Sequence, residues 1–232
     1  MRVIGLIGGM SWSSTVEYYR IINQLVTEKL GRLHSARLVL YSLDFEEVEK
    51  AQREARWDDA TDILTEAAMA IKAAGADFLV LCANTMHKVA EAVVERANLP
   101  LLHIGDAVGE ALREQGIRKA GLLGTRFVME EPFYRNRLEE LYGIEVVVPE
   151  EEGRSTINRI IYDELCREII EPASRRACLK VISGLVEQEV EGIILGCTEL
   201  PLLIRQDDLT IHVFDSTRLH AEAAVNRALS ET

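Results

Sequence analysis

Two kinds of segment occur once in each half of this 232-residue chain. Residues 3–9 and 119–125 each combine a short apolar run with glycines. Residues 76–85 and 192–200 each place small and polar residues directly after an apolar run. A short apolar run that ends in such residues is typical of a buried strand and the turn that follows it. The repetition therefore predicts two halves of similar structure.

Between these segments, short apolar runs alternate with stretches such as 58–74, whose apolar residues recur at helical spacing. Alternating strands and helices form parallel sheets with helices on both faces. We therefore predict an α/β fold of two pseudo-symmetric lobes, each a parallel sheet flanked by helices. Residues 1–98 plus 211–232 are expected to form the first lobe, and 99–210 the second.

The polar loops that follow the predicted strands are the best candidates for a site. In open parallel sheets, ligands bind beyond the carboxyl ends of the strands. No linker rich in proline, glycine or serine separates the two halves of the sequence. We therefore expect the lobes to pack around a cleft that holds the active site.

The composition excludes several classes of function. A formal net charge of −12 at pH 7 argues against nonspecific binding to nucleic acid or to an anionic membrane. No apolar stretch reaches the roughly 18 residues that a membrane-spanning helix needs. Because the N-terminal residues read as a strand rather than a targeting segment, a cytoplasmic location is expected.

The four cysteines are predicted to be free thiols. None of Cys82, Cys166, Cys178 and Cys197 forms a Cys-x-x-Cys pair, and none has zinc-ligand spacing to a histidine. In a reducing compartment such cysteines stay unpaired. The sequence therefore predicts neither disulfides nor a metal site.

Superposing the two strand segments by Leu81 and Leu195 places Ala83, and not Cys82, on Cys197. Asn84 then falls on Thr198. Because neighbouring residues of a strand point to opposite faces, Cys82 is expected to face the packing layer if residue 83 faces the site. The chain is therefore predicted to offer one thiol and one methyl group at equivalent strand ends.

Cys197 is a candidate acid/base group, because a helix N-terminus after the strand would favour the thiolate. The other interpretation is a small buried residue in a packed strand. Thr198 and its backbone N–H groups could hold a carboxylate. Asn84 and Thr85 could bind a carboxylate too, or could simply cap the next helix.

At these residues the chain resembles the cofactor-independent aspartate/glutamate racemase family, over essentially its whole length. The matching motifs are residues 8–15, 34–36, 44–45, 84–88, 123–125, 158–162, 196–199 and 214–217, followed by His220.

The resemblance implies a two-lobed fold in which two opposed acid/base groups exchange the α-proton of aspartate or glutamate. It implies no pyridoxal phosphate and no metal, a small-molecule amino-acid substrate, and a possible homodimer. Catalytic roles fall on Cys197 and on position 83. Substrate-binding roles fall on Met10, Gln52, Asn84, Thr85, Thr198, Glu199 and Arg159.

The chain departs from the family pattern at Ala83, where the family has cysteine or sometimes threonine. Alanine has no proton to exchange, so a weakened, one-base or substrate-trapping racemase is expected. A single-cysteine decarboxylase or isomerase of the same superfamily is an alternative, and so is a non-catalytic amino-acid-binding protein. An engineered Cys→Ala substitution would give the same sequence.

Overall fold

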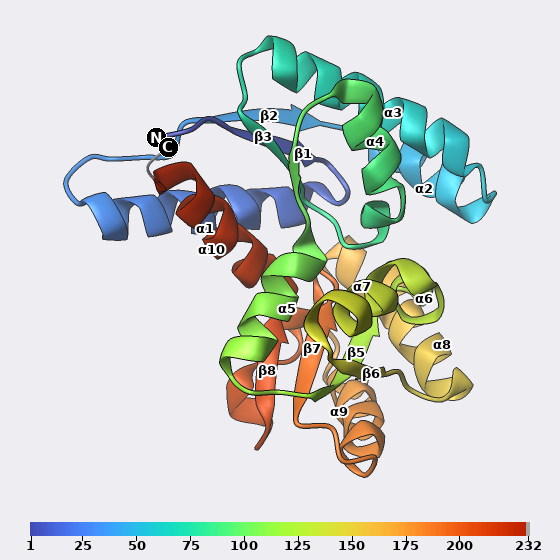
Figure 1. The fold of residues 1–232 in the computed structure, drawn as a ribbon. Helices are drawn as coiled ribbons and strands as arrows, with labels where there is room; N and C mark the ends of the chain where they lie inside the picture. The colour runs from blue at the N-terminus through green and yellow to red at the C-terminus, as the bar shows by residue number, and fades with distance from the viewer. Residues whose placement is uncertain (231–232) are drawn as a thin grey trace. The chain divides into compact units, whose positions relative to one another are not determined.

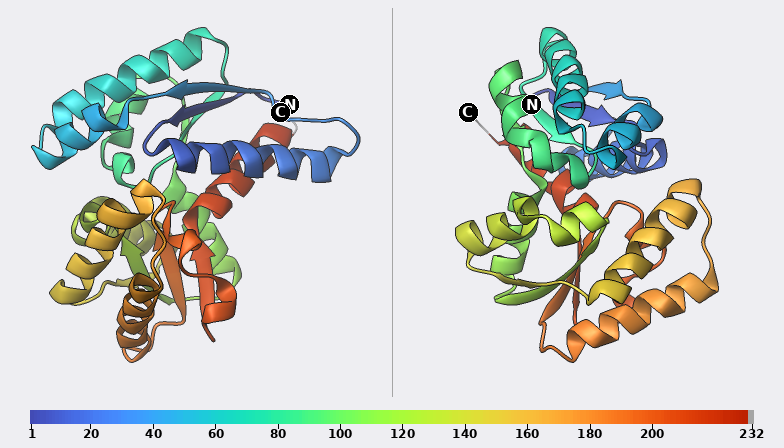
Figure 2. Two further views of the ribbon diagram at one scale, coloured as in Figure 1. Left: turned by 180° about the vertical axis from the view of Figure 1, so that it is seen from behind. Right: turned by 90° about the vertical axis from the view of Figure 1, so that its right-hand side faces the viewer.

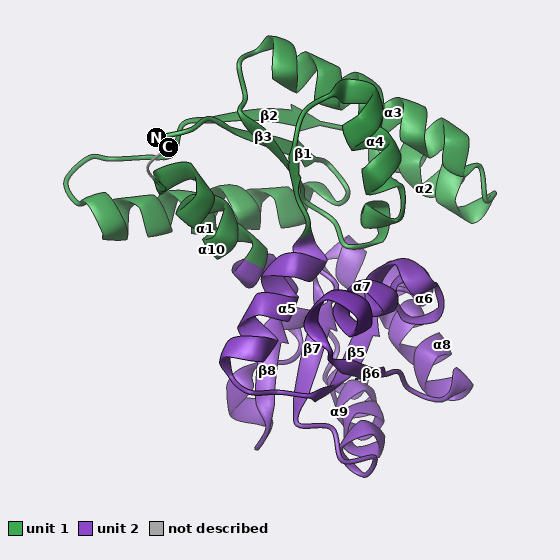
Figure 3. Cartoon of the chain, in the orientation of Figure 1, with its two compact units in different colours: residues 1–103, 220–232 green, residues 104–219 purple. Residues whose placement is uncertain are grey.

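A computed structural model describes residues 1–230 of the chain. The fold consists of two compact units (Figure 3). Met1–His103 forms the first unit together with the segment that begins at His220, and Ile104–Leu219 forms the second. Each unit contains one parallel sheet, which confirms the predicted α/β fold class.

The first sheet contains β1 (Ile4–Gly8), β2 (Leu38–Ser42), β3 (Phe78–Leu81) and β4 (Leu101–Leu102). Within the described residues its strand order is β2-β1-β3-β4, and all the pairings are parallel (Figure 1). β1 and β3 are the central strands, and every residue in them is buried. Burial on both faces explains why these strands are continuous apolar runs and do not alternate with polar residues.

Helices cover both faces of this sheet (Figure 2). α1 (Trp12–Leu30) and α10 (Ser216–Leu229) pack on one face, while α2 (Phe45–Arg53), α3 (Trp57–Ala73) and α4 (Ala90–Ala97) pack on the other. α10 contributes small residues, including Ala221, Ala224 and Ala228, to the layer that it shares with α1.

Side chains along β3 and the two residues after it point alternately into these two layers. Cys82 packs, fully buried, in the layer of α1 and α10. Leu81 and Ala83 pack in the layer of α2, α3 and α4. The predicted opposite orientation of residues 82 and 83 is therefore confirmed, and it follows from the alternation of side chains along a strand.

The second sheet repeats the topology of the first. It contains β5 (Lys119–Gly124), β6 (Glu145–Val147), β7 (Gly192–Gly196) and β8 (His212–Asp215), in the order β6-β5-β7-β8 within the described residues. The two orders become identical when four is added to each strand number of the first sheet.

The strand registers match as well. Ile7 of β1 pairs with Leu81 of β3, and Leu123 of β5 pairs with Leu195 of β7. Ala83 and Cys197 each lie two residues beyond these paired leucines, so they occupy equivalent positions in the two sheets.

The second unit has α5 (Ile104–Glu114) and α7 (Pro132–Tyr142) on one face of its sheet, and α8 (Glu151–Arg159) and α9 (Pro172–Val186) on the other. The short helix α6 (Arg126–Glu130) precedes α7. Turns of other types are η1 (Thr85–Val89), η3 (Leu165–Arg167), η4 (Leu200–Leu202) and η5 (Gln206–Asp208), which are 3-10 helices, and η2 (Ile160–Glu164), which is a π-helix.

The units divide at different residues from those that the sequence suggested, which were 98/99 and 210/211. The observed divisions lie at His103/Ile104 and Leu219/His220. β4 pairs with β3 and so joins the first unit, whereas β8 pairs with β7 and so joins the second. Residues 231 and 232, which were assigned to the first lobe, lie outside the described residues.

The turn after β1 predicts a large effect of one glycine substitution. Gly9 has φ +89°, and a Cβ placed there would lie 2.1 Å from the carbonyl oxygen of Leu43. Gly143 also has positive φ, +67°, but a Cβ there would meet nothing within 4 Å. We expect Gly9→Ala to lower the free energy of unfolding by about 3 kcal/mol, and Gly143→Ala by about 1 kcal/mol. Urea titration followed by circular dichroism measures both, and equal costs would contradict the steric argument.

Candidate functional site

In the second unit, Cys197 follows β7 and is buried, with 6% of its surface exposed. Its Sγ donates a hydrogen bond to Oε2 of Glu199 over 3.0 Å. Thr198 donates to the same oxygen from its hydroxyl over 2.7 Å. Glu199, which is itself only 4% exposed, therefore receives two side-chain hydrogen bonds from its immediate neighbours. The predicted residues Cys197, Thr198 and Glu199 form one connected group.

The surroundings of Cys197 oppose the thiolate that a helix N-terminus was expected to favour. Burial raises the pKa of the Cys197 thiol well above its ordinary value, and the nearby charge of Glu199 raises it further. The expected helix dipole is weak, because the turn that follows is η4, a 3-10 helix of three residues. Cys197 is therefore a protonated thiol whose proton points at a carboxylate.

This geometry predicts that Glu199→Gln makes Cys197 more reactive. Removing the carboxylate charge lowers the pKa of the thiol, so more thiolate is present near neutral pH. We expect the alkylation of Cys197 by iodoacetamide at pH 8, followed by mass spectrometry, to become roughly tenfold faster. Glu191→Gln, at the opposite end of β7, is the matched control and should leave the rate unchanged. An unchanged rate in Glu199→Gln would contradict the electrostatic role of Glu199.

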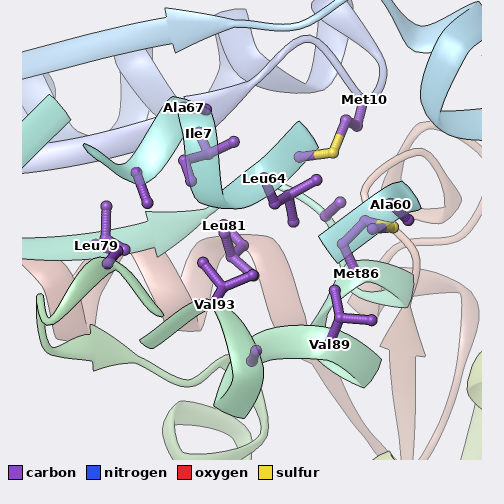
Figure 4. Close-up of a cluster of buried hydrophobic side chains, with 14 of the residues drawn as sticks. Ile7, Met10, Ala60, Leu64, Ala67, Leu79, Leu81, Met86, Val89 and Val93 are labelled. Carbon is purple, nitrogen blue, oxygen red and sulfur yellow. The ribbon is translucent and has the colours of Figure 1, made fainter. Parts of the chain in front are cut away.

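In the first unit, Ala83 lies in a buried cluster with Met10 and Met86. Figure 4 shows both methionines within this cluster. Gln52, on α2, is 4% exposed and donates from Nε2 to Sδ of Met86 over 2.9 Å. The fold therefore brings the predicted residues Met10, Gln52 and Ala83 into the same region, although they come from different segments of the sequence.

Asn84 and Thr85 directly follow Ala83 and are also buried, at 4% and 6% exposure. Asn84 occupies the N-cap position of η1, but its side chain makes no capping hydrogen bond there. Of the two sequence interpretations for Asn84, helix capping is therefore the one that the structure does not support.

Arg159 lies at the end of α8, where the helix changes into the π-turn η2. Its Nη1 donates to Oε1 of Glu164 over 2.9 Å, and its side chain is half exposed. The chain forms the α-helix α8, the π-turn η2 and the 3-10 turn η3 in succession. Single π-turns occur frequently at functional sites.

Sequence reasoning missed a cluster of three buried histidines in the first unit. The rings of His87 and His103 lie 4.5 Å apart between centroids, and those of His87 and His220 lie 5.7 Å apart. His87 donates from Nδ1 to the carbonyl oxygen of Ala83 over 2.8 Å. The spacing of four residues between Ala83 and His87 was the one available signal, because His103 and His220 are remote in sequence.

Within residues 1–230, no group of three or more histidine, cysteine, aspartate or glutamate side chains is arranged to hold a metal ion. Over the same residues, none of the helices combines the length and apolar character required to cross a membrane.

These features agree with comparisons to known proteins. A putative Asp/Glu racemase from Yersinia pestis is 52% identical and superposes with a TM-score of 0.93, covering 99% of this chain and 100% of that chain. An aspartate racemase homologue from Pyrococcus horikoshii OT3 is 38% identical, with a TM-score of 0.86 and coverage of 99% and 100%. A broad specificity amino-acid racemase from Bacillus subtilis is 22% identical over 98% of this chain and 99% of its own length.

The two four-stranded sheets define a two-unit racemase fold within the described residues. The chain belongs to the Asp/Glu/hydantoin racemase family, whose model matches residues 7–224. Amino-acid racemases are isomerases, and this chain is an isomerase of that family. The resemblance drawn from the sequence motifs is confirmed.

Proposed function

We propose that this protein exchanges the α-proton of aspartate or glutamate without a cofactor, and that Cys197 is its principal acid/base group. The observation that carries the proposal is the buried Cys197 thiol, hydrogen-bonded to the Glu199 carboxylate. A thiol becomes a base only as thiolate, and the carboxylate provides a place for its proton.

The proton transfers follow from this pair. Glu199 accepts the proton of Cys197, and the thiolate then removes the hydrogen from Cα, leaving a carbanion. Return of a proton from the same thiol restores the original enantiomer. Inversion requires a donor on the other side of Cα, and the methyl group of Ala83 has no proton to give. The protein is therefore proposed to exchange one enantiomer with retention and to racemise slowly.

The remaining polar residues are proposed to hold the substrate. Asn84, Thr85 and Thr198 would bind the α-carboxylate through amide and hydroxyl donors. Arg159 would bind the side-chain carboxylate, which would replace Glu164 as its partner. Met10 and Gln52 would shape the pocket. Aspartate and glutamate differ by one methylene, worth only about 1–3 kcal/mol, so either fits this residue set.

Proton NMR in deuterated water tests the proposal with L- and D-aspartate and L- and D-glutamate. We expect the α-proton signal of one enantiomer to disappear while little of its mirror image accumulates, as measured by chiral chromatography. Equal exchange and inversion would show that a second donor exists. Absence of exchange, with a dicarboxylic amino acid still raising the melting temperature, would indicate a binding protein that lacks the chemistry.

The presence of a thiol at Cys197 but not at the equivalent position, Ala83, also favours a second candidate function, a decarboxylase. A substituted malonate that loses carbon dioxide leaves a carbanion which needs one proton, and Cys197 alone could deliver it. Release of carbon dioxide from arylmalonate or alkylmalonate, with no exchange of amino-acid α-protons, would favour this reaction.

A cytoplasmic homodimer belongs to the same proposal. The free thiols of Cys82, Cys166, Cys178 and Cys197 fit a reducing compartment, and the family resemblance supports a dimer. Light scattering coupled to size-exclusion chromatography measures the mass of the assembly.

A further inference from the structure

The histidine cluster of the first unit consists of His87, His103 and His220, all nearly or fully buried, at 3%, 7% and 0% exposure. Three imidazoles in such contact are not needed to fill a core, since apolar side chains would pack there without polar groups to satisfy. None of the three belongs to the proposed acid/base chemistry. Their hydrogen bonds show what they connect.

The hydrogen bonds determine which ring nitrogens carry protons. His87 Nδ1 and His220 Nε2 both bond to backbone carbonyl oxygens, of Ala83 over 2.8 Å and of Leu102 over 2.9 Å. A carbonyl oxygen only accepts, so both nitrogens must carry a proton. His220 Nδ1 bonds to the hydroxyl of Tyr18 over 2.9 Å. In neutral His220 this nitrogen accepts, and Tyr18 donates.

These bonds connect the loop after β3 to distant parts of the first unit. His103 is the last residue before the chain leaves this unit, and His220 is the first after it returns. His87 contacts both rings and holds the carbonyl of Ala83. The segment 83–85 carries two of the proposed carboxylate-binding residues. The imidazole of His87 therefore connects this segment to the two points where the chain leaves and re-enters the first unit.

We propose that His87 is a positioning residue that holds the loop 83–85 in place through its Nδ1–H bond to Ala83, and that protonation of His87 within its cluster with His103 and His220 loosens this loop. The importance of the loop for catalysis rests on the proposed function, whereas its attachment to His87 does not.

The surroundings of the cluster explain why protonation is unfavourable. Tyr18 on α1 is a titratable neighbour of His220, and Cys82, which follows β3, packs in the layer of Tyr18. Lys88 of η1 lies instead over the ring of Trp57, 3.8 Å from its centroid. Burial lowers the pKa of His87 well below its ordinary value, and His103 and His220 lower it further.

The direction of the pH effect follows from this shift. Above pH 6.5 the ring of His87 is neutral in both the folded and the unfolded chain. Below that pH the unfolded chain binds a proton that the folded cluster does not accept, so the fold loses stability as the pH falls. Opening of the loop, which releases His87 to water, becomes more favourable in the same range.

Hydrogen–deuterium exchange of the peptide that covers residues 83–90, read by mass spectrometry at pH 7.5 and 5.5, tests the inference without any catalytic readout. His87→Asn keeps an N–H donor near the position of Nδ1 but cannot titrate, and His87→Leu keeps the bulk without the donor. His212→Asn changes an exposed histidine on β8 and is the matched control.

After correction for intrinsic exchange, the wild type and His212→Asn should exchange about tenfold faster at pH 5.5 than at pH 7.5. His87→Asn should be slow at both values, and His87→Leu fast at both. Loss of α-proton exchange in His87→Leu with recovery in His87→Asn would link the loop to the proposed activity. Wild-type protection in His87→Leu, or a wild-type pH response in His87→Asn, would overturn the inference even if the protein racemises amino acids. A protein without activity that shows the expected protection pattern would refute only the proposed function.

Discussion

Ala83→Cys is expected to raise the rate of racemisation by about 100- to 10,000-fold, the range typical of one general acid/base group. The reason lies in the strand registers. Residue 83 stands two positions beyond Leu81 as Cys197 stands two beyond Leu195, and both leucines pair at equivalent places in their sheets. Under the proposed function, a thiol at 83 therefore supplies a second acid/base group at the position equivalent to that of Cys197. Chiral chromatography of L- and D-aspartate or glutamate reactions gives the rate.

Two controls isolate the thiol as the cause. Ala83→Ser adds an atom of similar bulk in the same buried cluster, but its hydroxyl is a far weaker acid, so we expect little gain. Cys82→Ser in the Ala83→Cys background should keep the gain, because Cys82 packs in the opposite layer. The side chain added at 83 could cost up to about 3 kcal/mol of stability by overpacking, which a thermal melt detects. No gain in a variant that folds and binds would contradict the assignment of position 83.

Cys197→Ala is expected to abolish exchange of the α-proton, with a loss of about 1,000-fold or more. The substitution removes the sulfur that donates to Glu199 and leaves Asn84, Thr85 and Thr198, the residues proposed to bind the ligand, unchanged. The melting temperature should therefore still rise with a dicarboxylic amino acid. Cys178→Ala, on α9 of the same unit, serves as the control and should keep its exchange rate. Exchange that survives in Cys197→Ala would remove Cys197 from the mechanism.

The double variant Ala83→Cys with Cys197→Ala sharpens both predictions. The thiol proposed for acid/base chemistry is moved from the second unit to the first. If the two positions serve opposite sides of Cα, this variant should exchange the enantiomer that the wild type leaves unchanged. Exchange of the same enantiomer as the wild type would contradict the idea of two opposed groups. NMR in deuterated water distinguishes the two outcomes.

The parallel sheets, their helical layers and the repeat were predictable because they depend on local periodicity. Apolar runs such as 78–81 and 192–196 are buried on both faces, and this requirement is visible in the sequence itself. The same alternation predicted that Cys82 and Ala83 face opposite layers. The catalytic and substrate-binding roles of the individual residues stay predictions, which the experiments above address.

Other features could be learned only from the folded chain. The limits of the units depend on the pairing of β4 with β3 and of β8 with β7, and strand pairing between remote segments leaves no local pattern. The protonated state of Cys197 depends on its burial and on the direction of the Glu199 side chain. Composition and spacing suggested the opposite state, because they contain no information about a desolvated neighbour.

By itself, the sequence determined the fold class, the twofold repeat and the fact that Ala83 occupies the position equivalent to that of Cys197, since each of these follows from side-chain period and residue order. Only the tertiary structure decided which remote groups meet, as His87, His103 and His220 do. The physical reason is that burial, hydrogen bonding and charge interactions act over a few ångströms in space, and the chain separates these three histidines by up to 133 residues.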